Sequence, residues 1–297
     1  MKHLFVVNPA AGKGKAEKFI DRIREEAEGL LEEYEIAVTE HPGHATEIVR
    51  EHVSRERCRV YSVGGDGTLN EVVNGMAGSD SVLAVIPAGS GNDFIRTVTS
   101  DDSKKDIIAR TIRGKEAPVD LVKVNDNYFI NVSSMGLDAE AAYNANQLKK
   151  VPLVPGVLSY YLGLIGVLVR CKSYKMKVTM DELTVEGDFL LAVIANGKFY
   201  GKGILPAPRA DFQDGTLDIC LIDRKRRLEI IYLFPKYIKG KHTNVKGVNF
   251  YTSKDVHIIS EDSVAVNMDG EVSRILEATY HIIPNGIQVV FPEPYTK

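Results

Sequence analysis

The sequence contains no tryptophan and only three cysteines among its 297 residues. The cysteines, Cys58, Cys171 and Cys220, are far apart and odd in number, so they imply neither a disulfide framework nor a cysteine metal site. This usage fits a reducing compartment, and we expect a cytoplasmic protein. The short apolar run at residues 4–7 has no cleavage site after it and does not predict a signal peptide.

The chain also lacks a large excess of charge of either sign. Its 37 basic and 40 acidic residues give a net charge of −3, and 44% of its residues are hydrophobic. Since nucleic-acid binding usually requires a strongly basic surface, we expect no nucleic-acid partner. The length is that of two ordinary domains.

No uninterrupted apolar run is long enough to cross a bilayer. The nearest candidate, residues 151–169, contains prolines and glycines, and only the part after Pro155 favours a continuous helix. That part is shorter than the roughly 20 residues that a membrane span needs. We expect a buried or lipid-facing helix there, and both a core helix and the lining of an acyl-chain cleft stay open.

What the chain does have is a glycine-rich turn, Gly64-Gly65-Asp66-Gly67-Thr68. An apolar, β-branched strand pattern precedes the turn, and helical spacing of apolar residues follows it. Glycines let a phosphate approach the backbone closely, and a helix N-terminus attracts an anion. Thr68 is expected to cap the helix or to contact a phosphate, and Asp66 offers a carboxylate to a nucleotide-bound Mg²⁺. The alternative is a tight turn that binds no ligand, and the rarity of this sequence motif disfavours it.

Three further strand patterns, at residues 4–7, 34–39 and 81–87, also end in polar or glycine-containing loops. This alternation predicts an α/β domain with a doubly wound, mostly parallel sheet. Because strand ends of such a sheet meet at one crevice, these loops are expected to face a common ligand. His41 and His44 lie in one of the loops, where a metal role is the less favoured interpretation.

The pattern changes near Pro118, which we take as the domain boundary. We expect one domain over residues 1–118 and a second over 119–297. The last residues of the chain could pack back onto the first domain. The second half predicts an antiparallel β-sandwich. Its expected strands are residues 119–124, 128–132, 175–180, 183–196, 216–222, 256–260, 264–268, 278–283 and 288–291, and its expected helices are 139–149, 158–169 and 228–239.

Five motifs occur in one order along the chain. They are Asn8-Pro9-Ala10-Ala11-Gly12, the glycine-rich turn continued to Asn70, Pro87-Ala88-Gly89-Ser90-Gly91-Asn92-Asp93-Phe94, Val119-Asp120, and Met268-Asp269-Gly270-Glu271. Together they resemble the diacylglycerol-kinase-type lipid kinases, and most closely the soluble bacterial members. The glycine-rich turn alone is shared with NAD kinases, whereas the block that begins at Pro87 and the late Asp269-Gly270-Glu271 favour the lipid branch.

The resemblance implies an ATP-dependent lipid kinase with its active site between two domains. It implies ATP contacts at Asn8, Pro9, Ala10, Ala11, Gly12, Thr39, Gly64, Gly65, Asp66, Gly67, Thr68, Leu69, Asn70 and Ser90. It also implies that Glu271 is the general base. A structural Mg²⁺ site is implied in the second domain, with a carboxylate from Asp214 and backbone carbonyls from Asp211 and Thr216; a plain hairpin turn is the alternative there.

The chemistry of phosphoryl transfer accounts for these residue types independently, since it needs positioning and charge neutralisation. Glycine N–H groups and Lys13 are expected to hold phosphates. Asp66, Asp93 and Asp120 are expected to form an acidic cluster for catalytic Mg²⁺, although Asp120 could instead cap a turn. A carboxylate beside the acceptor alcohol would take its proton. Glu271 is preferred to Asp269 on family grounds, and Asp269 is expected to form a turn.

Basic residues 224–227 precede an apolar helix pattern at 228–237. This arrangement suits peripheral contact with an anionic membrane surface, with a solvated charge run as the alternative. The sequence leaves open whether the chain forms a homodimer. The leading hypothesis is therefore a kinase that uses Mg·ATP on a lipid alcohol, with diacylglycerol as the default substrate. The alternatives are an NAD kinase, which the Asn92-Asp93 loop disfavours, and an inactive lipid-binding regulator.

Overall fold

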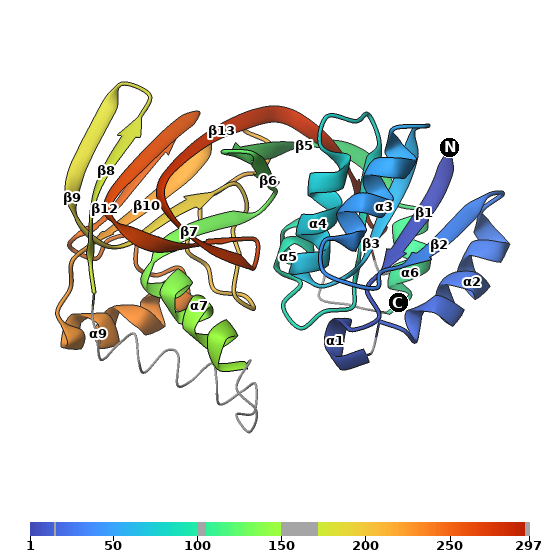
Figure 1. The fold of residues 1–297 in the computed structure, drawn as a ribbon, viewed down its shortest axis with the longest axis horizontal. Helices are drawn as coiled ribbons and strands as arrows, with labels where there is room; N and C mark the ends of the chain where they lie inside the picture. Colours follow the sequence, from blue (N-terminus) through green and yellow to red (C-terminus); the bar gives the residue numbers. More distant parts are fainter. Residues whose placement is uncertain (15, 100–104, 150–171, 295–297) are drawn as a thin grey trace.

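The computed structural model describes residues 1–14, 16–99, 105–149 and 172–294. Its first part alternates strands and helices, and its second part consists mainly of strands (Figure 1). The elements of the first part are β1 (Lys2–Val7), α1 (Ala11–Gly14), α2 (Phe19–Leu30), β2 (Tyr34–Val38), α3 (His44–Val53), β3 (Cys58–Gly64), α4 (Asp66–Met76), β4 (Val82–Pro87), α5 (Asp93–Val98) and α6 (Ile107–Ile112).

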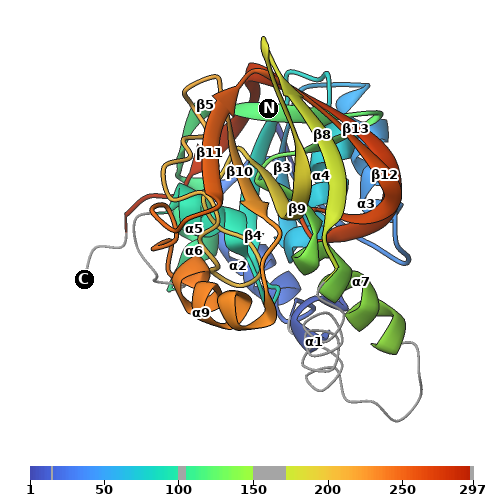
Figure 2. The ribbon, with the colours of Figure 1, turned by 90° about the vertical axis from the view of Figure 1, so that its left-hand side faces the viewer.

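The second part is a β-sandwich with helices at one end (Figure 2). Its elements are β5 (Lys115–Val124), β6 (Asn127–Phe129), β7 (Val132–Gly136), α7 (Leu137–Lys149), β8 (Tyr174–Met180), β9 (Leu183–Ala195), β10 (Leu217–Asp223), α9 (Arg227–Ile238), β11 (Val248–Ser253), β12 (Asp255–Met268) and β13 (Glu271–Phe291). The expected fold class, an α/β domain followed by a strand-rich domain, is confirmed.

The sheet of the first part is parallel and has the order β4-β3-β1-β2. β1, β3 and β4 are largely buried, as parallel strands between two layers of helices require, whereas the edge strand β2 is half-buried. Successive residues of β1 pack on opposite sides: Leu4 and Val6 lie in one core with α3 and α4, and Phe5 and Val7 in the other with α2 and α6. The carboxyl ends of the four strands therefore meet at one edge.

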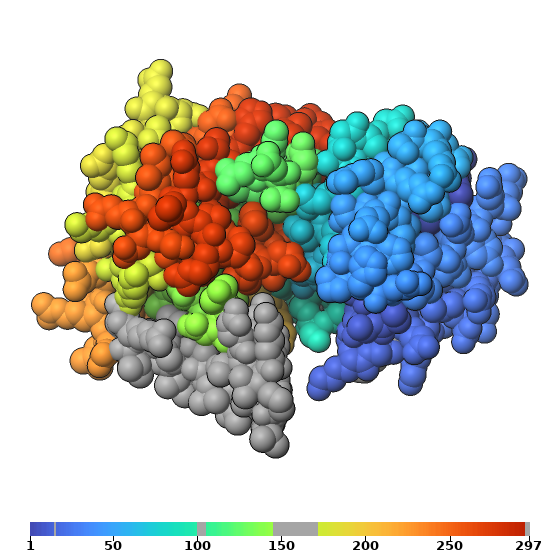
Figure 3. Space-filling model, viewed as in Figure 1, coloured from blue at the N-terminus to red at the C-terminus, as the bar shows by residue number. Residues whose placement is uncertain are grey.

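One long strand joins the two parts. The beginning of β13 pairs with β12 in antiparallel fashion, and its end pairs with β4 in parallel fashion at Gln288 and Val289. Strand β5 runs antiparallel to β13 along much of its length. The chain's last strand thus returns to the first sheet, and the two parts meet along the middle of the molecule in Figure 3.

Three strand predictions need correction. The expected strand 128–132 is interrupted after Phe129, because the N–H groups of Ile130, Asn131 and Val132 donate to the Asp269 carboxylate instead of to a strand. The four late strands predicted from 256 onward are only two, β12 and β13, each continuing through a register irregularity. Strand β11 went unpredicted because its mostly half-buried residues do not alternate between apolar and polar.

Within the described part of the chain, none of the helices has the length and apolar character needed to cross a membrane. The helix and acyl-chain cleft expected within residues 151–169 lie outside the described residues.

Candidate active site

Two turns at the strand ends pack against each other backbone to backbone. The N–H groups of Ala88 and Gly89 donate to the Gly64 carbonyl at 2.9 and 2.8 Å. A Cβ atom on Gly89 would lie 2.3 Å from the Cα of Gly65, which no side chain can accept. Glycine is therefore required at this contact because there is no room for a Cβ atom. The contact holds the turn after β3 against the turn after β4.

Thr68 joins this assembly to the first loop. Helix α4 begins at Asp66 with Gly65 as its N-cap, so the predicted capping role of Thr68 is wrong. Its hydroxyl instead accepts a hydrogen bond from the Asn8 amide at 3.0 Å. The Asn8 carbonyl accepts the Ala11 N–H at 3.1 Å, and Gly12 and Lys13 follow with positive φ. The loop after β1 is thus fixed beside the first turn of α4.

Asp66 organises the start of α5. Its two carboxylate oxygens accept the backbone N–H groups of Asn92 at 2.9 Å and Asp93 at 2.7 Å. A Cβ atom on Gly91 would lie 2.3 Å from the Asp66 carboxylate, so this glycine makes room for it. A carboxylate that accepts N–H groups at a helix N-terminus is favoured by both hydrogen bonding and the helix dipole.

Asp93 carries the same kind of link into the second part. Its carboxylate oxygens accept the N–H groups of Lys202 at 2.9 Å and Gly203 at 2.8 Å. The residue is buried, and burial raises the pKa of its carboxyl, with the nearby Asp66 charge adding to the rise. Asp66 and Asp93 thus form a chain of carboxylate-to-amide bonds from α4 to the loop at residues 200–203.

Glu271 lies against the glycine-rich turn from the other side. A Cβ atom on Gly67 would come within 3.1 Å of its Oε1 atom, so the carboxylate and the turn are in contact. Desolvation raises the pKa of Glu271, and the Glu71 carboxylate contributes to the rise. The structure therefore brings Glu271 to the same turn as Asp66 although 205 positions separate them in the sequence.

Asp269 forms the two-residue turn between β12 and β13 together with Gly270, and both have positive φ. Its buried carboxylate accepts the three N–H groups of residues 130–132. Burial raises the pKa of Asp269 to about 6. The expected turn-forming role is thus what the structure shows, with an additional role in holding the start of β7.

Asp66, Asp93 and Asp269 border a polar pocket with about 970 Å³ of empty space, part of it open to solvent, whereas Glu271 lies beside Gly67 and outside this lining. The pocket is lined from the first part by Gly65, Asp66, Gly67, Leu69, Ser90, Gly91, Asp93 and Phe94, and from the second by Asn131, Val132, Tyr200, Gly201, Lys202, Asn267, Asp269 and Gly270. Lys202 is the cationic residue of this lining. It has φ 73° between two glycines, a conformation that L-residues other than glycine adopt at a cost.

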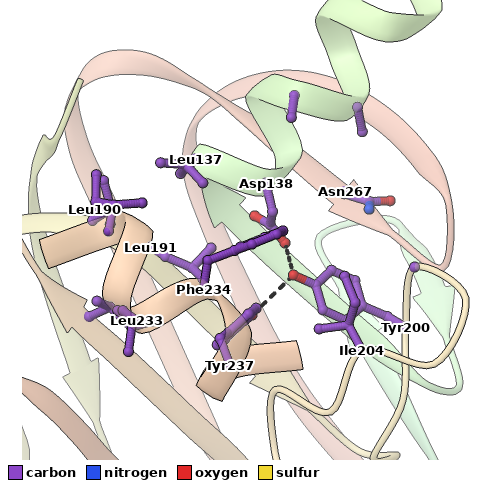
Figure 4. Close-up of a pocket in the computed structure, with 15 residues that line it drawn as sticks. Leu137, Asp138, Leu190, Leu191, Tyr200, Ile204, Leu233, Phe234, Tyr237 and Asn267 are labelled. Atoms are coloured by element: carbon purple, nitrogen blue, oxygen red, sulfur yellow. Dashed lines mark hydrogen bonds between the residues drawn. The ribbon is translucent and has the colours of Figure 1, made fainter. Parts of the chain in front are cut away.

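An apolar cavity of about 780 Å³, also partly open to solvent, adjoins the polar pocket. Leucines and isoleucines of α7, β9 and α9 form its walls (Figure 4). Tyr200, Gly201 and Asn267 line both spaces. Its main polar group is Asp138, which accepts a hydrogen bond from the Tyr200 hydroxyl; that hydroxyl also contacts Tyr237 at 3.0 Å. Burial raises the pKa of Asp138.

The predicted three-carboxylate cluster is wrong. The Asp120 carboxylate accepts the N–H groups of Gly215 at 2.7 Å and Asn285 at 2.8 Å, and Asp120 does not line the pocket of Asp66 and Asp93. In the described ranges, only His41, His44 and Glu47 bring three potential ligand atoms within 4.8 Å of one another. Asp120 therefore belongs with the loop at residues 211–216, and the alternative that it holds a turn is what the structure shows.

That loop closes largely on itself. Asp214 accepts the N–H and the hydroxyl of Thr216, both at 2.9 Å, and Asp211 accepts the Gln213 N–H at 3.1 Å. Sequence reasoning missed Asp218, which is buried beside it. Burial raises the pKa of Asp218 to about 6; the Asp214 and Asp211 charges add to the rise, whereas Arg209 and Lys198 oppose it.

The remaining predicted nucleotide contacts lie at the same edge or near it. Leu69 and Ser90 line the polar pocket, whereas Thr39 is buried and donates its N–H to the Val7 carbonyl at 2.9 Å. Asn70 donates through its amide to the Tyr128 carbonyl at 3.3 Å, which ties α4 to β6. Lys13 is exposed.

The histidine group at the start of α3 has a structural explanation. The His44 Nδ1 atom accepts the Glu40 N–H at 3.1 Å, which leaves the proton of a neutral ring on Nε2. Glu71, the residue after Asn70, accepts the N–H groups of Gly43 and Ala45. These bonds hold the loop against α4, and a metal at His44 would have to break one of them.

Four features of the site escaped sequence reasoning: Asn131, the loop at residues 200–203, Asn267 and Glu71. None has a distinctive spacing in the chain. Only the Tyr-Gly-Lys-Gly sequence at 200–203, in a stretch rich in glycine, could have indicated a loop that approaches a ligand.

The fold and this site define a two-domain protein with a polar pocket between glycine-rich βα turns and a β-sandwich. Residues 2–124 match the diacylglycerol kinase catalytic domain, and residues 131–291 match the YegS C-terminal NAD kinase beta sandwich-like domain. The chain therefore belongs to the diacylglycerol kinase family of lipid kinases, as its motifs suggested.

Relatives of similar length support this assignment. The diacylglycerol kinase of Bacillus subtilis (strain 168) is 28% identical, with 97% of this chain and 95% of that protein covered. A second protein of that strain, YtlR, provisionally named a lipid kinase, is 31% identical over 92% of this chain and 94% of its own. A Bacillus anthracis str. Sterne crystal structure, provisionally named a diacylglycerol kinase, has a TM-score of 0.78 at 27% identity and covers 98% and 97% of the two chains.

Proposed function

We propose that this protein transfers the γ-phosphate of ATP to the hydroxyl group of a membrane lipid, with diacylglycerol as the first substrate to test. The observation that carries the proposal is the adjacency of a polar pocket and an apolar cavity, which share Tyr200, Gly201 and Asn267. A kinase acting on a lipid alcohol needs both environments at one reacting centre. The family relationship supports the kinase class.

The first turn of α4 is suited to bind the phosphates of ATP. Gly65 and Gly67 leave the backbone open to the pocket, and the helix N-terminus favours anions. Lys202 adds a positive charge beside three carboxylates. Asp66 and Asp93 keep lone pairs beyond those used by backbone N–H groups, so they fit an octahedral Mg²⁺ that retains several waters. Mg²⁺ would supply charge neutralisation on the transferring phosphoryl group.

Glu271 fits the role of general base. Its raised pKa makes the carboxylate a better proton acceptor than an ordinary glutamate. In the proposed step the lipid hydroxyl oxygen forms a bond to the γ-phosphorus and gives its proton to Glu271. The bond from that phosphorus to the β–γ bridging oxygen breaks, and ADP leaves with the electron pair.

The apolar cavity suits the hydrocarbon part of the substrate. Its walls are apolar, and small-molecule sites typically combine apolar walls with a few fixed polar groups. Asp138 and Tyr200 provide such groups close to the shared boundary. An ester or hydroxyl of the lipid would meet them where the hydrocarbon chain begins.

The loop at residues 211–216 is proposed to hold a second, structural Mg²⁺. Asp214 would supply a carboxylate, and Asp211 and Thr216 would supply backbone carbonyls, as the family resemblance implies. The proximity of Asp211 and Asp214 to Asp218 supports the proposal, because a divalent cation would offset the repulsion among these carboxylates. Loss of this ion is expected to lower the melting temperature, measured calorimetrically with and without a chelator.

The decisive experiment is a transfer assay with radiolabelled ATP against a panel of lipid alcohols and NAD. We expect label in a lipid phosphate and none in NADP. Label in NADP alone would support the NAD-kinase alternative, and lipid binding without any transfer would support an inactive regulator.

A further inference from the structure

Helix α9 is apolar on two opposite sides. Its inner side, with Ile230, Leu233 and Tyr237, is buried in the second part. Its outer side exposes Leu228 by 80%, Ile231 by 59% and Tyr232 by 64%. A helix on the surface of a soluble domain normally turns a polar face to water, so the outer side of α9 departs from that rule.

The exposed residues form one stripe. Leu228, Ile231, Tyr232 and Pro235 follow the spacing i, i+3, i+4 and i+7, which places them on one side of a helix. Eight large hydrophobic side chains are exposed among the described residues, and three of them belong to this stripe. The concentration on one helix separates it from the scattered apolar residues of any protein surface.

Basic side chains border the stripe. Arg227 lies one turn before Ile231, and Lys236 lies one turn after Tyr232 with its Nζ atom 4.0 Å from the ring centroid. Arg224, just before the helix, contacts Asp188 at 3.5 Å, and both side chains are exposed. The helix carries one acidic residue, Glu229, whose carboxylate accepts the Arg226 N–H. An apolar centre with cationic borders is complementary to the headgroup region of an anionic bilayer.

The same helix separates the outer stripe from the apolar cavity. Ile230, Leu233 and Phe234 of α9 line the cavity, which continues toward the polar pocket (Figure 4). In Figure 1 α9 lies at the lower end of the second part, and residues of α7 form another wall of the cavity. A bilayer against the outer side of α9 would therefore lie one helix diameter from the space proposed for the substrate's hydrocarbon part.

We infer that the outer side of α9 docks on the surface of an anionic bilayer, with Leu228, Ile231 and Tyr232 entering the boundary between headgroups and acyl chains. The choice of a bilayer rests on the proposed lipid substrate as well as on the charge pattern. Docking itself requires neither ATP nor transfer, so it can be measured separately from catalysis.

The test is co-sedimentation of the full chain, without ATP, with vesicles of phosphatidylcholine or of equimolar phosphatidylcholine and phosphatidylglycerol. We expect stronger binding to the mixed vesicles, weakened by salt. Replacing Ile231 by Gln should lower the partition coefficient by about tenfold, since most of a buried isoleucine's transfer free energy is lost. Leu276→Gln, at a residue of β13 that is 55% exposed, is the matched control and should change nothing.

The charge component has its own variant. Lys236→Gln should weaken binding to the mixed vesicles by a few-fold, in keeping with the modest contribution of one cation near an anionic surface, and should leave binding to pure phosphatidylcholine unchanged. Because Ile231 and Leu276 are exposed and Lys236 is half-buried, none of the variants removes core packing, and each should keep a melting temperature close to that of the wild type.

Two results would overturn the inference. One is vesicle binding by Ile231→Gln equal to that of the wild type. The other is a dimer, seen by analytical ultracentrifugation without vesicles, that Ile231→Gln dissociates, since the stripe would then bind a second copy of the chain. Neither result bears on phosphate transfer, and a failed transfer assay would leave the vesicle result standing.

Discussion

The polar pocket and the apolar cavity lie side by side but are held in place by different forces. In the polar pocket, Asp66, Asp93 and Asp269 each bind two or three backbone N–H groups, so directed bonds of 2.7–3.2 Å fix their positions. In the cavity, leucines and isoleucines fix the shape through packed area. Single atoms therefore matter in the first region, whereas volume matters in the second.

The largest effect is expected from Glu271→Gln. The amide keeps the shape of the side chain but cannot accept the proton of the lipid hydroxyl, so kcat should fall about a hundredfold or more, with little change in KM for ATP. Steady-state kinetics with radiolabelled ATP measures both. Glu261→Gln, an exposed residue on β12, is the control. Turnover near the wild-type value in Glu271→Gln would exclude Glu271 as the general base.

Asp66→Ala should act on both activity and stability. It removes the acceptor for two N–H groups at the start of α5 and should abolish most transfer while leaving the fold intact. The free energy of unfolding should drop by about 2 kcal/mol, typical for hydrogen bonds to a charged group. Urea unfolding compares it with Asp80→Ala, an exposed residue of the same domain. Equal stability of both variants would contradict the described role of Asp66.

The sequence allowed the βα turns to be predicted because glycines follow buried strands there, and it placed Glu271 in a named motif. It could not show what the acids bind. Asp66 meets N–H groups 26 and 27 positions away, and Asp93 meets a loop more than a hundred positions on. Such pairings depend on how the two parts assemble, and the same holds for Asp120, which the assembly places beside residues 211–216.

Filling the apolar cavity should affect only the lipid. Ala142→Phe places a ring in the cavity and should lower kcat/KM for the lipid about tenfold while KM for ATP is unchanged, since one packed group is worth about 1–3 kcal/mol. Leu233→Met keeps the volume and should behave nearly as the wild type. If Ala142→Phe impaired the use of ATP as much as the use of the lipid, the two regions would not be functionally separable.

A smaller, divided effect is expected at Lys202. Lys202→Gly removes a cation from the polar pocket, and it also removes the cost of about 1 kcal/mol that a non-glycine residue incurs at positive φ. KM for ATP should rise a few-fold, while thermal unfolding shows equal or slightly higher stability. Lys202→Ala should raise KM equally without the gain in stability. Unchanged KM in both variants would exclude Lys202 from phosphate binding.

The smallest effect is a shift in pH dependence. Glu271 must be deprotonated to act as the base, and its pKa is raised. Activity should therefore fall with decreasing pH around a midpoint above that of an ordinary glutamate. A profile of kcat/KM against pH measures this midpoint, and Glu271→Gln should lack that limb. A midpoint below the ordinary glutamate value would contradict the raised pKa.

The most direct test of the central claim is a crystal structure of the protein with Mg²⁺ and a non-hydrolysable ATP analogue. We expect the terminal phosphate against Gly65 and Gly67 at the first turn of α4, with the Glu271 carboxylate beside it at Gly67. A triphosphate bound away from this turn, with Glu271 remote from its terminal phosphate, would contradict it.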